Sequence, residues 1–484
     1  MKMGPVSEYT GGVASVVDQG RTTVVLRSPR SSLAWTGHEP KIVAPNSGEH
    51  AEQIVLFSAV LHEQGPSKWS AAMDTVYACC CGLDVHKKSV SACVRRVGTG
   101  GAIRREVRAF GTMTAELLTM ADWLAEERVT HVAMESTGVF WKPIYNLLEG
   151  RFEVLLVNAQ HIKRVPGRKT DVKDCEWIAQ LLQYGLLQGS FVPERPQREL
   201  RDLTRHRAQL VAEKTRIANR IHKTLEDANI KLGAVATDIL GVSGRQMLEA
   251  LAGGEDDPTK LAELARQRLR AKIPQLRLAL QGQLREHHRF MLRALLDHLT
   301  QLEELIARFN QRIEELMAPF AEAMQRLHAI PGVDRRTAEN VLAEIGSDLG
   351  QFPTAEQLAS WAGICPGSHE SAGKRKSGKI NKGNRWLRQA LVQAAWAASR
   401  AKDSYLCAQY RRLAGRRGKK RALIAIGHTL LVVCYHVLKH RVPYQDLGSD
   451  YFDRLHADRL RRYFLRRLES LGYQVTLHPN HNAA

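Results

Sequence analysis

Residues 77–94 read YACCCGLDVHKKSVSACV, two apolar runs separated by the charged stretch DVHKK. Short apolar runs interrupted by charged residues are typical of strands. The second run continues to Val97, and REVRAFGT at 105–112 is a third run of the same kind. We therefore predict three successive strands that form a meander.

The segments that follow alternate between helical and strand patterns. Residues 114–129 (TAELLTMADWLAEERV) have helical spacing, THVAMES at 130–136 reads as a strand, and a short helix is expected at 140–149. FEVLLVNA at 152–159 is a fifth apolar strand, which leads into the basic loop HIKRVPGRKT. This order predicts an α/β domain with a central mixed sheet covered by helices.

Four carboxylates fall at chemically informative places in this domain. Asp84 and Glu135 each end an apolar run, so both can project from the tips of neighbouring strands. Asp171 and Asp174 lie three residues apart where a helix should begin, which puts them on one face of its first turn. Clustered carboxylates need a counter-ion, and hard Mg²⁺, with Mn²⁺ as an alternative, would bridge them to a phosphate.

Each carboxylate also has a purely structural interpretation. Asp84 fits a turn, and Asp171 and Asp174 fit a helix N-terminus, where the dipole favours negative charge. Glu135 is harder to explain in this way, because it follows an apolar strand and precedes Ser-Thr-Gly. Taken with their basic flank, the four favour a phosphoryl-transfer site. That flank, which we expect to contact nucleic acid, consists of Lys163, Arg164, Arg168 and Lys169.

Composition points to a polyanionic partner. The 484 residues predict two or three domains, and 70 Lys and Arg against 50 Asp and Glu leave a net charge of +20. A membrane surface is the lesser alternative. The longest apolar stretch, 422–438, is broken by Gly427, His428, Thr429 and His436, so we expect a buried helix there and not a membrane span. The eight cysteines lack zinc-type spacing and no secretory signal is visible, so we expect reduced thiols in the cytoplasm.

The chain outside the α/β domain changes character several times. Residues 1–72 are rich in Gly, Ser, Pro and Thr, and are interpreted as a disordered extension or a mis-called start before Met73. We predict the catalytic domain at 73–190, a helical, coiled-coil region at 191–325, a further domain at 326–445 and a tail at 446–484.

The helical region contains two long amphipathic stretches, at 199–232 and about 261–320. The first is rich in Arg and Lys and forms either a phosphate-contacting arm or a solvated helix face. The second has spacing suited to pairing with another helix, in the same chain or in a second subunit. A dimer is therefore one expectation.

Residues 328–346 (HAIPGVDRRTAENVLAEIG) are typical of a helix-hairpin-helix, whose turn can grip a phosphate, although an ordinary helical turn is the alternative. The loop that follows should lie on nucleic acid, and its glycines, Gly373, Gly378 and Gly383, would let the backbone approach phosphate. Its basic residues are Lys374, Arg375, Lys376, Lys379, Lys382, Arg385 and Arg388. Ser371 precedes them, and from the residues alone a turn former or phosphate ligand is a better interpretation than a nucleophile.

The order of these motifs over residues 76–440 resembles the DEDD-type insertion-sequence transposases, the family of RNA-guided bridge recombinases. The resemblance is carried by GLDVHKKSV, MESTGVFWKPIYNLL, RKTDVKDCEWIAQLL, IPGVDRRTAENVLAEIG and the Ser371 loop. It implies an N-terminal RuvC-like domain of RNase H fold, a long helical middle and a C-terminal transposase domain with a catalytic serine. The family's acidic tetrad falls on Asp84, Glu135, Asp171 and Asp174, and its serine on Ser371, with Ser377 a nearby competitor.

The resemblance also implies a mechanism and partners. Mg²⁺ on the tetrad would help Ser371 attack DNA phosphorus, a noncoding RNA would choose the donor and target DNA, and a tetramer would form from dimers. The enzyme would then act in the bacterial cytoplasm, at the nucleoid. A RuvC-like nuclease acting by hydrolysis, which needs no Ser371, is the alternative, and a non-enzymatic nucleic-acid-binding protein is disfavoured by the motif order.

Overall fold

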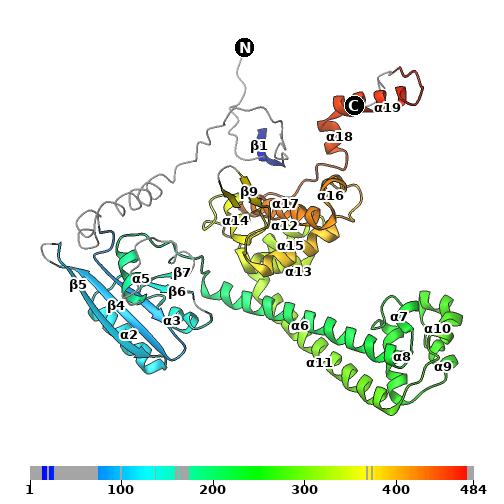
Figure 1. The fold of residues 1–484 in the computed structure, drawn as a ribbon, viewed down its shortest axis with the longest axis horizontal. Coiled ribbons are helices and arrows are strands. Elements are labelled where there is room, and N and C mark those ends of the chain that lie inside the picture. Colours follow the sequence, from blue (N-terminus) through cyan, green and yellow to red (C-terminus); the bar gives the residue numbers. More distant parts are fainter. Residues whose placement is uncertain are drawn as a thin grey trace. The chain divides into compact units, whose positions relative to one another are not determined.

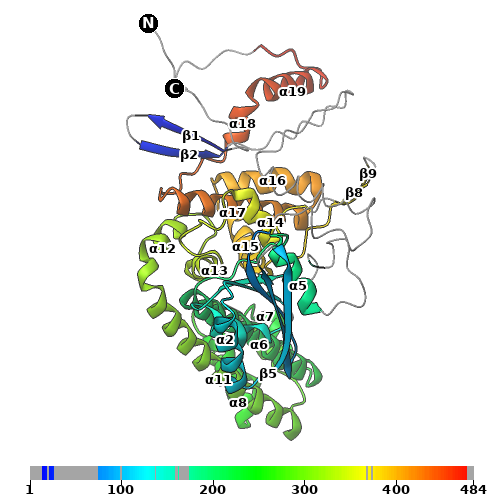
Figure 2. The same ribbon diagram turned by 90° about the vertical axis from the view of Figure 1, so that its left-hand side faces the viewer.

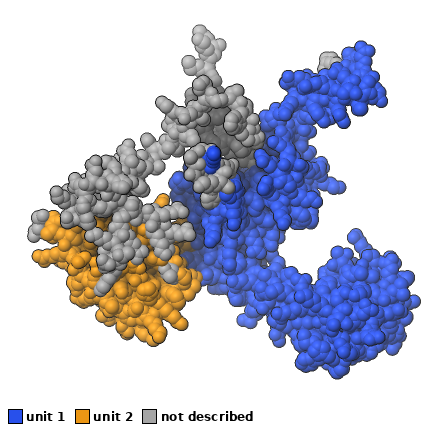
Figure 3. All heavy atoms as spheres, in the orientation of Figure 1, with its two compact units in different colours: residues 1–32, 194–484 blue, residues 33–193 orange. Residues whose placement is uncertain are grey.

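A computed structural model describes residues 13–18, 21–26, 75–98, 101–136, 138–158, 162, 174–366, 369–371 and 374–476. The chain divides into two compact units, residues 33–193 and residues 1–32 with 194–484 (Figure 3). The prediction for residues 1–72 lies almost wholly outside the described residues. The exception is an antiparallel pair, β1 (Val13–Asp18) and β2 (Arg21–Leu26), which we did not predict.

The unit at 33–193 is built on a five-stranded mixed sheet. Its strands lie in the order β5-β4-β3-β6-β7. The meander pairs are antiparallel, whereas β3–β6 and β6–β7 are parallel. The bounds are β3 (Cys79–Val85), β4 (Ser89–Val97), β5 (Ile103–Gly111), β6 (His131–Glu135) and β7 (Glu153–Val157). The predicted α/β class, strand number and strand places are confirmed.

Helices cover both faces of this sheet (Figure 1). On one face, α2 (Thr114–Glu126) and α3 (Trp141–Leu148) bury Met120, Leu124 and Ile144 against the strands. On the other, α5 (Asp174–Gln183) buries Trp177 and Ile178. The sheet is therefore a layer between helices, as its nearly continuous apolar strands require.

The other unit begins with a helical hairpin rather than with an open arm. The helix α6 (Arg195–Asp227) packs along α11 (Glu286–Met317), as Figure 1 shows. Lys214 contacts Glu303 at 2.8 Å, and further along Asp227 contacts His288 at 2.8 Å, so the two helices are antiparallel. The predicted pairing of the second helical stretch with another helix is thus satisfied within the chain.

Four short helices pack at the end of this hairpin and share its core. They are α7 (Leu232–Val235), α8 (Val242–Gly253), α9 (Pro258–Glu263) and α10 (Ile273–Ala279). The second predicted helical stretch, about 261–320, is helical in several pieces, and its long helix begins only at Glu286. Pro274 is the second residue of α10, and Gly282 lies against the Ala228 carbonyl, where a Cβ would stand 2.6 Å away.

The remaining helices surround α17 (Lys419–Lys439), which packs against four of them. Those four are α12 (Ala321–His328), α14 (Ala355–Ala362), α15 (Arg385–Ala398) and α16 (Tyr405–Arg417). In the described part of the chain, α17 is the one helix long and apolar enough to cross a membrane. It buries Leu430, Leu431 and Cys434 in this bundle, as expected for a buried helix. The tail adds α18 (Tyr451–Leu455) and α19 (Ala457–Glu469), which Figure 2 shows from a second side.

The predicted helix-hairpin-helix is a pair of helices, α12 and α13 (Arg335–Ile345), joined by a Pro-Gly turn. Gly332 in the turn has φ +88° and packs against α15, where a Cβ would stand 2.4 Å from the Ala394 carbonyl oxygen. Asp334 caps α13 by accepting from the Thr337 N–H at 2.8 Å. The turn between α12 and α13 is therefore packed against α15. This structural role favours an ordinary helical turn over a phosphate-binding turn.

Candidate active site

Asp84 and Glu135 lie side by side near the ends of adjacent parallel strands. Leu83 of β3 pairs with Met134 of β6, so the next residue in each strand is Asp84 and Glu135. Neighbouring strands lie about 4.8 Å apart. Leu83 and Met134 are buried on the face covered by α2 and α3. Because side chains alternate along a strand, the two carboxylates project to the other face, that of α5.

A glycine lets α5 lie directly on that face. Gly82 shares the face with Asp84, and a Cβ at Gly82 would stand 2.3 Å from the Ala179 nitrogen and 2.4 Å from the Cys175 carbonyl oxygen. Only a residue without a side chain permits this approach. This contact was not predicted, although a glycine inside an apolar strand often marks a close backbone contact.

The direction of α5 brings its first residue to the carboxylate end of the sheet. The N–H groups of Val76 and Tyr77, just before β3, donate to the Gln183 carbonyl at the end of α5, at 3.0 and 3.2 Å. The helix therefore runs antiparallel to β3. Its first residue, Asp174, is exposed and lies toward the strand ends that carry Asp84 and Glu135.

These carboxylates form part of a donor set that fits a hard divalent cation. Among the described residues, no group of three or more His, Cys, Asp and Glu side chains is close enough to hold a metal ion. The fourth predicted ligand, Asp171, lies outside the described residues, as do Lys163, Arg164, Arg168 and Lys169. The described geometry thus supplies two adjacent carboxylates and a third at the same end of the sheet.

His86 is a further neighbour of this site that we did not predict. Its Nε2 lies 3.2 Å from Asp84 Oδ2, and the His86 side chain is 66% exposed. It is two residues after Asp84, which is the spacing that places side chains on one face of a strand. His86 can therefore orient the Asp84 carboxylate from the solvent side.

Ser371 lies in the other compact unit, at the end of a short hairpin. The strands β8 (His369–Ser371) and β9 (Lys374–Ser377) are antiparallel, and Ser371 pairs with Lys374. The side chains of Ser371, Arg375 and Lys376 lie outside the described residues. The backbone thus places Ser371 opposite Lys374, at the front of the basic loop.

Ser377, the other serine considered, has a structural role in this hairpin. Its Oγ accepts a hydrogen bond from the Lys379 N–H at 3.1 Å. A hydroxyl that accepts from the backbone two residues ahead stabilises a turn.

The base of the loop is closed by backbone contacts. A Cβ on Gly383 would stand 2.3 Å from the Gly363 nitrogen, and Arg388 donates to the carbonyls of Gly363 and Asn381, both at 3.4 Å. Asn384 accepts from the N–H groups of Trp386 and Leu387 and so begins α15. Gly383 therefore packs against protein backbone on the side where a Cβ would project, and its contact with phosphate stays a prediction.

Comparisons with known proteins match two segments of the chain. A transposase model of the DEDD type matches residues 81–230, and the model described as "Transposase IS116/IS110/IS902 family" matches residues 324–411. The chain belongs to this transposase family. The first segment contains all four predicted acidic residues, and the second contains Ser371.

Relatives of the transposase agree with this assignment. The transposase for insertion sequence element IS1111A of Coxiella burnetii is 26% identical over 298 residues, 60% of this chain and 72% of the relative. A putative transposase of Sinorhizobium fredii is 26% identical over 65% of this chain and 70% of its own. The pilin gene-inverting protein of Moraxella bovis is 29% identical over 31% of this chain and 48% of its own. The protein is thus an enzyme of DNA transposition or recombination.

The predicted nucleic-acid contacts of the transposase divide by exposure. Lys374, Lys379, Lys382 and Arg385 are exposed. The Arg385 guanidinium lies 4.4 Å from the ring centre of Trp386, which is half-buried. Arg388 is held in the loop base described above. These exposed cations remain available to a polyanion, and their contacts with it stay a prediction.

The first turns of α6 are anchored to α13 by buried ion pairs. Arg205 donates from Nε and Nη2 to Glu344 at 2.7 and 2.8 Å, and Asn384 donates to the same carboxylate at 2.6 Å. Arg207 pairs with Glu339, and both side chains are at most 5% exposed. Burial lowers the pKa of Arg201, which also contacts Glu344, to about 10. These arginines of the basic segment therefore hold the protein together and are not a phosphate-contacting arm.

Proposed function

We propose that this transposase cleaves and exchanges DNA strands with the carboxylates of Asp84, Glu135, Asp171 and Asp174 and with Ser371 as nucleophile. The observation that supports it most strongly is the adjacent placement of Asp84 and Glu135 at parallel strand ends, with Asp174 at the same end. Two carboxylates held side by side in a protein of net charge +20 suit a cation that in turn attracts a phosphate.

Mg²⁺, or Mn²⁺, is the cation that these hard oxygen ligands favour. When bound, it would neutralise charge on the scissile phosphate and lower the pKa of a hydroxyl near it. The protein's own part is to hold the carboxylates on a rigid sheet, with α5 fixed against β3 through Gly82. His86 contributes by orienting Asp84.

The proposed chemical step conserves the phosphodiester energy. The Ser371 oxygen bonds to phosphorus, the bond from phosphorus to one deoxyribose oxygen breaks, and that oxygen leaves with a proton. A hydroxyl of a second DNA end then attacks the same phosphorus and releases serine. One bond forms for each that breaks, so strands exchange without a nucleotide cofactor. Ser377 is a weaker candidate because its hydroxyl already accepts from the Lys379 N–H.

We further propose that target choice uses a noncoding RNA and that the enzyme works as a homo-oligomer, a dimer or a tetramer, in the cytoplasm at the nucleoid. The excess of positive charge favours binding of both RNA and DNA. The exposed Lys374, Lys379, Lys382 and Arg385 would take part in these contacts, together with Lys163, Arg164, Arg168, Lys169, Arg375 and Lys376.

The decisive experiment traps the covalent intermediate. Wild-type protein is mixed with labelled donor and target DNA, Mg²⁺, and RNA transcribed from the element's flanks, and the products are resolved on a denaturing gel. We expect a protein–DNA adduct with the wild type and with Ser377→Ala, and none with Ser371→Ala. Omission of the RNA should remove cleavage at the chosen site.

The alternative function, a RuvC-like nuclease that acts by hydrolysis, would give different products on the same gel. Cleaved DNA without any adduct, equally with the wild type and Ser371→Ala, would support hydrolysis and exclude the serine. An adduct lost in Ser377→Ala and kept in Ser371→Ala would move the nucleophile to Ser377.

A further inference from the structure

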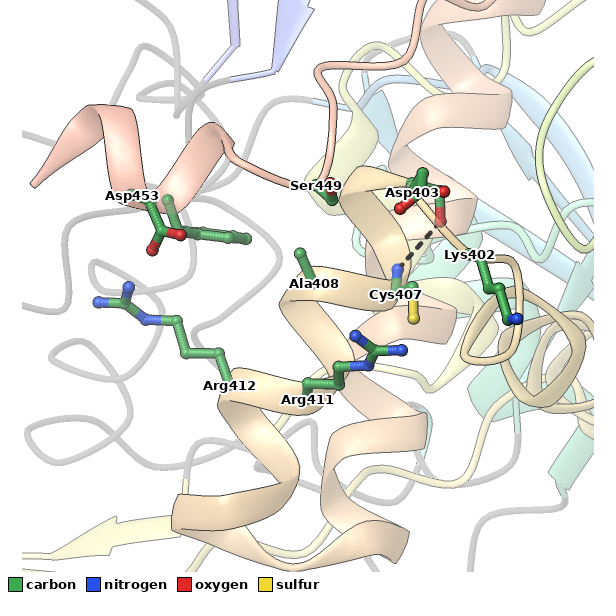
Figure 4. A pocket seen from close by; sticks show the side chains of 10 residues that line it. Lys402, Asp403, Cys407, Ala408, Arg411, Arg412, Ser449 and Asp453 are labelled. Atoms are coloured by element: carbon green, nitrogen blue, oxygen red, sulfur yellow. Dashed lines mark hydrogen bonds between the residues drawn. The ribbon is translucent and has the colours of Figure 1, made fainter. Parts of the chain in front are cut away.

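The C-terminal half of the chain contains a pocket outside the proposed active site. It has a volume of about 540 Å³ and lies between α16 and the segment that leads into α18 (Figure 4). Lys402, Arg411 and Arg412 line it together with Asp403 and Asp453. Figure 4 shows Arg412 on the side of Asp453 and Arg411 on the side of Lys402. The pocket thus gathers charges of both signs around one space.

Of the three cations of the pocket, Arg412 lies over the ring of Phe452. Within the described part of the chain, none of them forms an ion pair with an acidic side chain. In contrast, Arg201, Arg205 and Arg207 are all paired with buried glutamates. Three exposed cations and two carboxylates around one concavity leave an excess of positive charge, which favours an anion in the space.

The wall behind these cations is a rigid aromatic cluster. Phe452 is 8% exposed and stacks on Tyr405 with ring centres 5.3 Å apart. The Arg412 guanidinium lies over the Phe452 ring, 5.2 Å from the ring centre. Two backbone N–H groups in the first turn of α16 already have hydrogen-bond partners: the Tyr405 N–H donates to Asp446, and the Cys407 N–H donates to Ser404 Oγ. The ligand-binding capacity of the pocket therefore lies in its side chains.

We propose that this pocket binds an unpaired nucleotide of a nucleic-acid strand, with its phosphates on Lys402, Arg411 and Arg412. Arginine and lysine bind phosphate through charge-assisted hydrogen bonds. The carboxylates of Asp403 and Asp453 would repel a phosphate but accept from the amino group of a base edge, which an unpaired base exposes. A ligand that carries both groups therefore satisfies both charge types.

The size of the pocket favours an unpaired strand over a duplex. Its volume falls in the range of about 300 to 1,000 Å³ that is usual for sites that enclose a small molecule. A duplex keeps its base edges paired and cannot enter such a space. The surroundings would guide a strand to it, because residues 400–421 contain nine Lys and Arg and one acidic residue, Asp403.

The pocket also extends beyond the matched family segment. The transposase model ends at residue 411, whereas Arg412, Phe452 and Asp453 follow it. The site is thus built partly by the C-terminal tail. It does not depend on the identity of the nucleophile, because binding can be measured without strand cleavage.

Equilibrium binding with matched variants tests the proposal. The full-length protein is titrated into fluorescently labelled single-stranded DNA, single-stranded RNA of the same sequence and duplex DNA, and anisotropy is followed at several salt concentrations. Arg411→Gln with Arg412→Gln removes two pocket cations. Arg416→Gln with Arg417→Gln is the control, because it removes the same charge from the last turn of the same helix, where neither side chain lines the pocket.

We expect the pocket variant to bind single strands about 10- to 100-fold more weakly, and the control less than about threefold. The slope of log affinity against log salt should fall by about 1.4 for single strands, and duplex binding should change little. A greater loss with RNA than with DNA, or the reverse, identifies which strand is bound. Equal losses in both variants, or equal losses on duplex and single strand, would overturn the proposal.

A second variant removes the ambiguity of the Phe452 contact. Loss of Arg412 can loosen the aromatic wall, so Lys402→Gln with Arg411→Gln, which leaves that contact intact, should show the same selective loss of single-strand binding. All variants are compared with the wild type by thermal unfolding. A single-strand affinity unchanged in this second variant would also contradict the proposal.

Discussion

Gly82 of β3 and Ala179 of α5 are in backbone contact, because a Cβ on the glycine would stand 2.3 Å from the Ala179 nitrogen. This contact sets the distance between the strand that carries Asp84 and the helix that begins with Asp174. Asp84 and Asp174, which are 90 positions apart in the chain, are thus positioned relative to each other by Gly82.

Gly82→Ala should therefore destabilise the fold and impair strand cleavage. The added methyl group must push α5 away from the sheet, at a cost of about 1–3 kcal/mol of unfolding free energy. Urea unfolding of the full-length protein measures this cost. Gly189→Ala in the same unit is the control, because the nearest atom to its Cβ would be Leu155 Cγ, 3.9 Å away, and we expect little change. Equal stability of the two variants would show that α5 can shift freely.

Glu344→Gln should weaken the anchor between α6, α13 and α15. The Glu344 side chain is 2% exposed and accepts from Arg205 and Asn384, so its loss of charge leaves the buried Arg201 and the partly exposed Arg205 uncompensated. We expect a loss of about 3 kcal/mol of unfolding free energy. Glu199→Gln removes an exposed partner of Arg195, 63% exposed at 3.4 Å, and should cost less than about 1 kcal/mol in the same urea titration. A comparable cost for both would contradict the anchoring role.

Asp84→Asn should abolish cleavage of labelled donor DNA and preserve DNA affinity within about threefold. The amide keeps the size of the side chain but supplies a poorer metal ligand. Cleavage assays and anisotropy on the same preparation separate the two effects, and removal of divalent cations with a chelator should reproduce the variant's defect in the wild type. Asp122→Asn, on the surface of α2 and paired with Arg151 at 2.8 Å, should cleave normally. Normal cleavage by Asp84→Asn would exclude Asp84 from the site.

Acid should destabilise the C-terminal bundle through His436. Burial lowers the pKa of His436 to about 4, helped by the neighbouring His440 and opposed by Glu356. An unfolded histidine titrates near 6.5, so between about pH 6.5 and 4 the unfolded chain binds more protons and stability falls as the pH falls. Calorimetry should show a Tm that decreases across this window, with a smaller decrease for His436→Gln. The exposed His287→Gln should follow the wild type, and an unchanged pH dependence in His436→Gln would refute the assignment.

Much of the α/β unit was predictable because its elements are local patterns. The strand predicted at 89–97 coincides with β4 (Ser89–Val97), and Asp84 and Glu135 lie at neighbouring strand ends as expected. An apolar run, alternating or continuous, predicts a buried strand. The same run also shows where the strand ends, and so which polar residue lies at that end. The contacts of Gly82 and His86 were missed, because they depend on which element packs against the strand.

The basic segment of α6 shows the opposite case. Its Arg and Lys content equally fits an arm for phosphates and an internal anchor, and the sequence does not contain the partner's position. The structure pairs Arg207 with Glu339, 132 residues away, and Arg205 with Glu344, 139 residues away. Gly383 likewise lies against Gly363, so a glycine in this basic loop has a packing role that its sequence context did not indicate.

The sequence by itself determined the element types, the places of the acidic residues and the positive charge that suits a nucleic-acid partner, because these depend on neighbouring residues and on composition. The tertiary structure alone decided the direction of α5, the partners of the arginines in α6 and the pocket of Lys402, Arg411 and Arg412. Each of these three features depends on contacts between residues that are distant in the chain. Such contacts are determined by how whole helices and strands pack, which no local sequence pattern encodes.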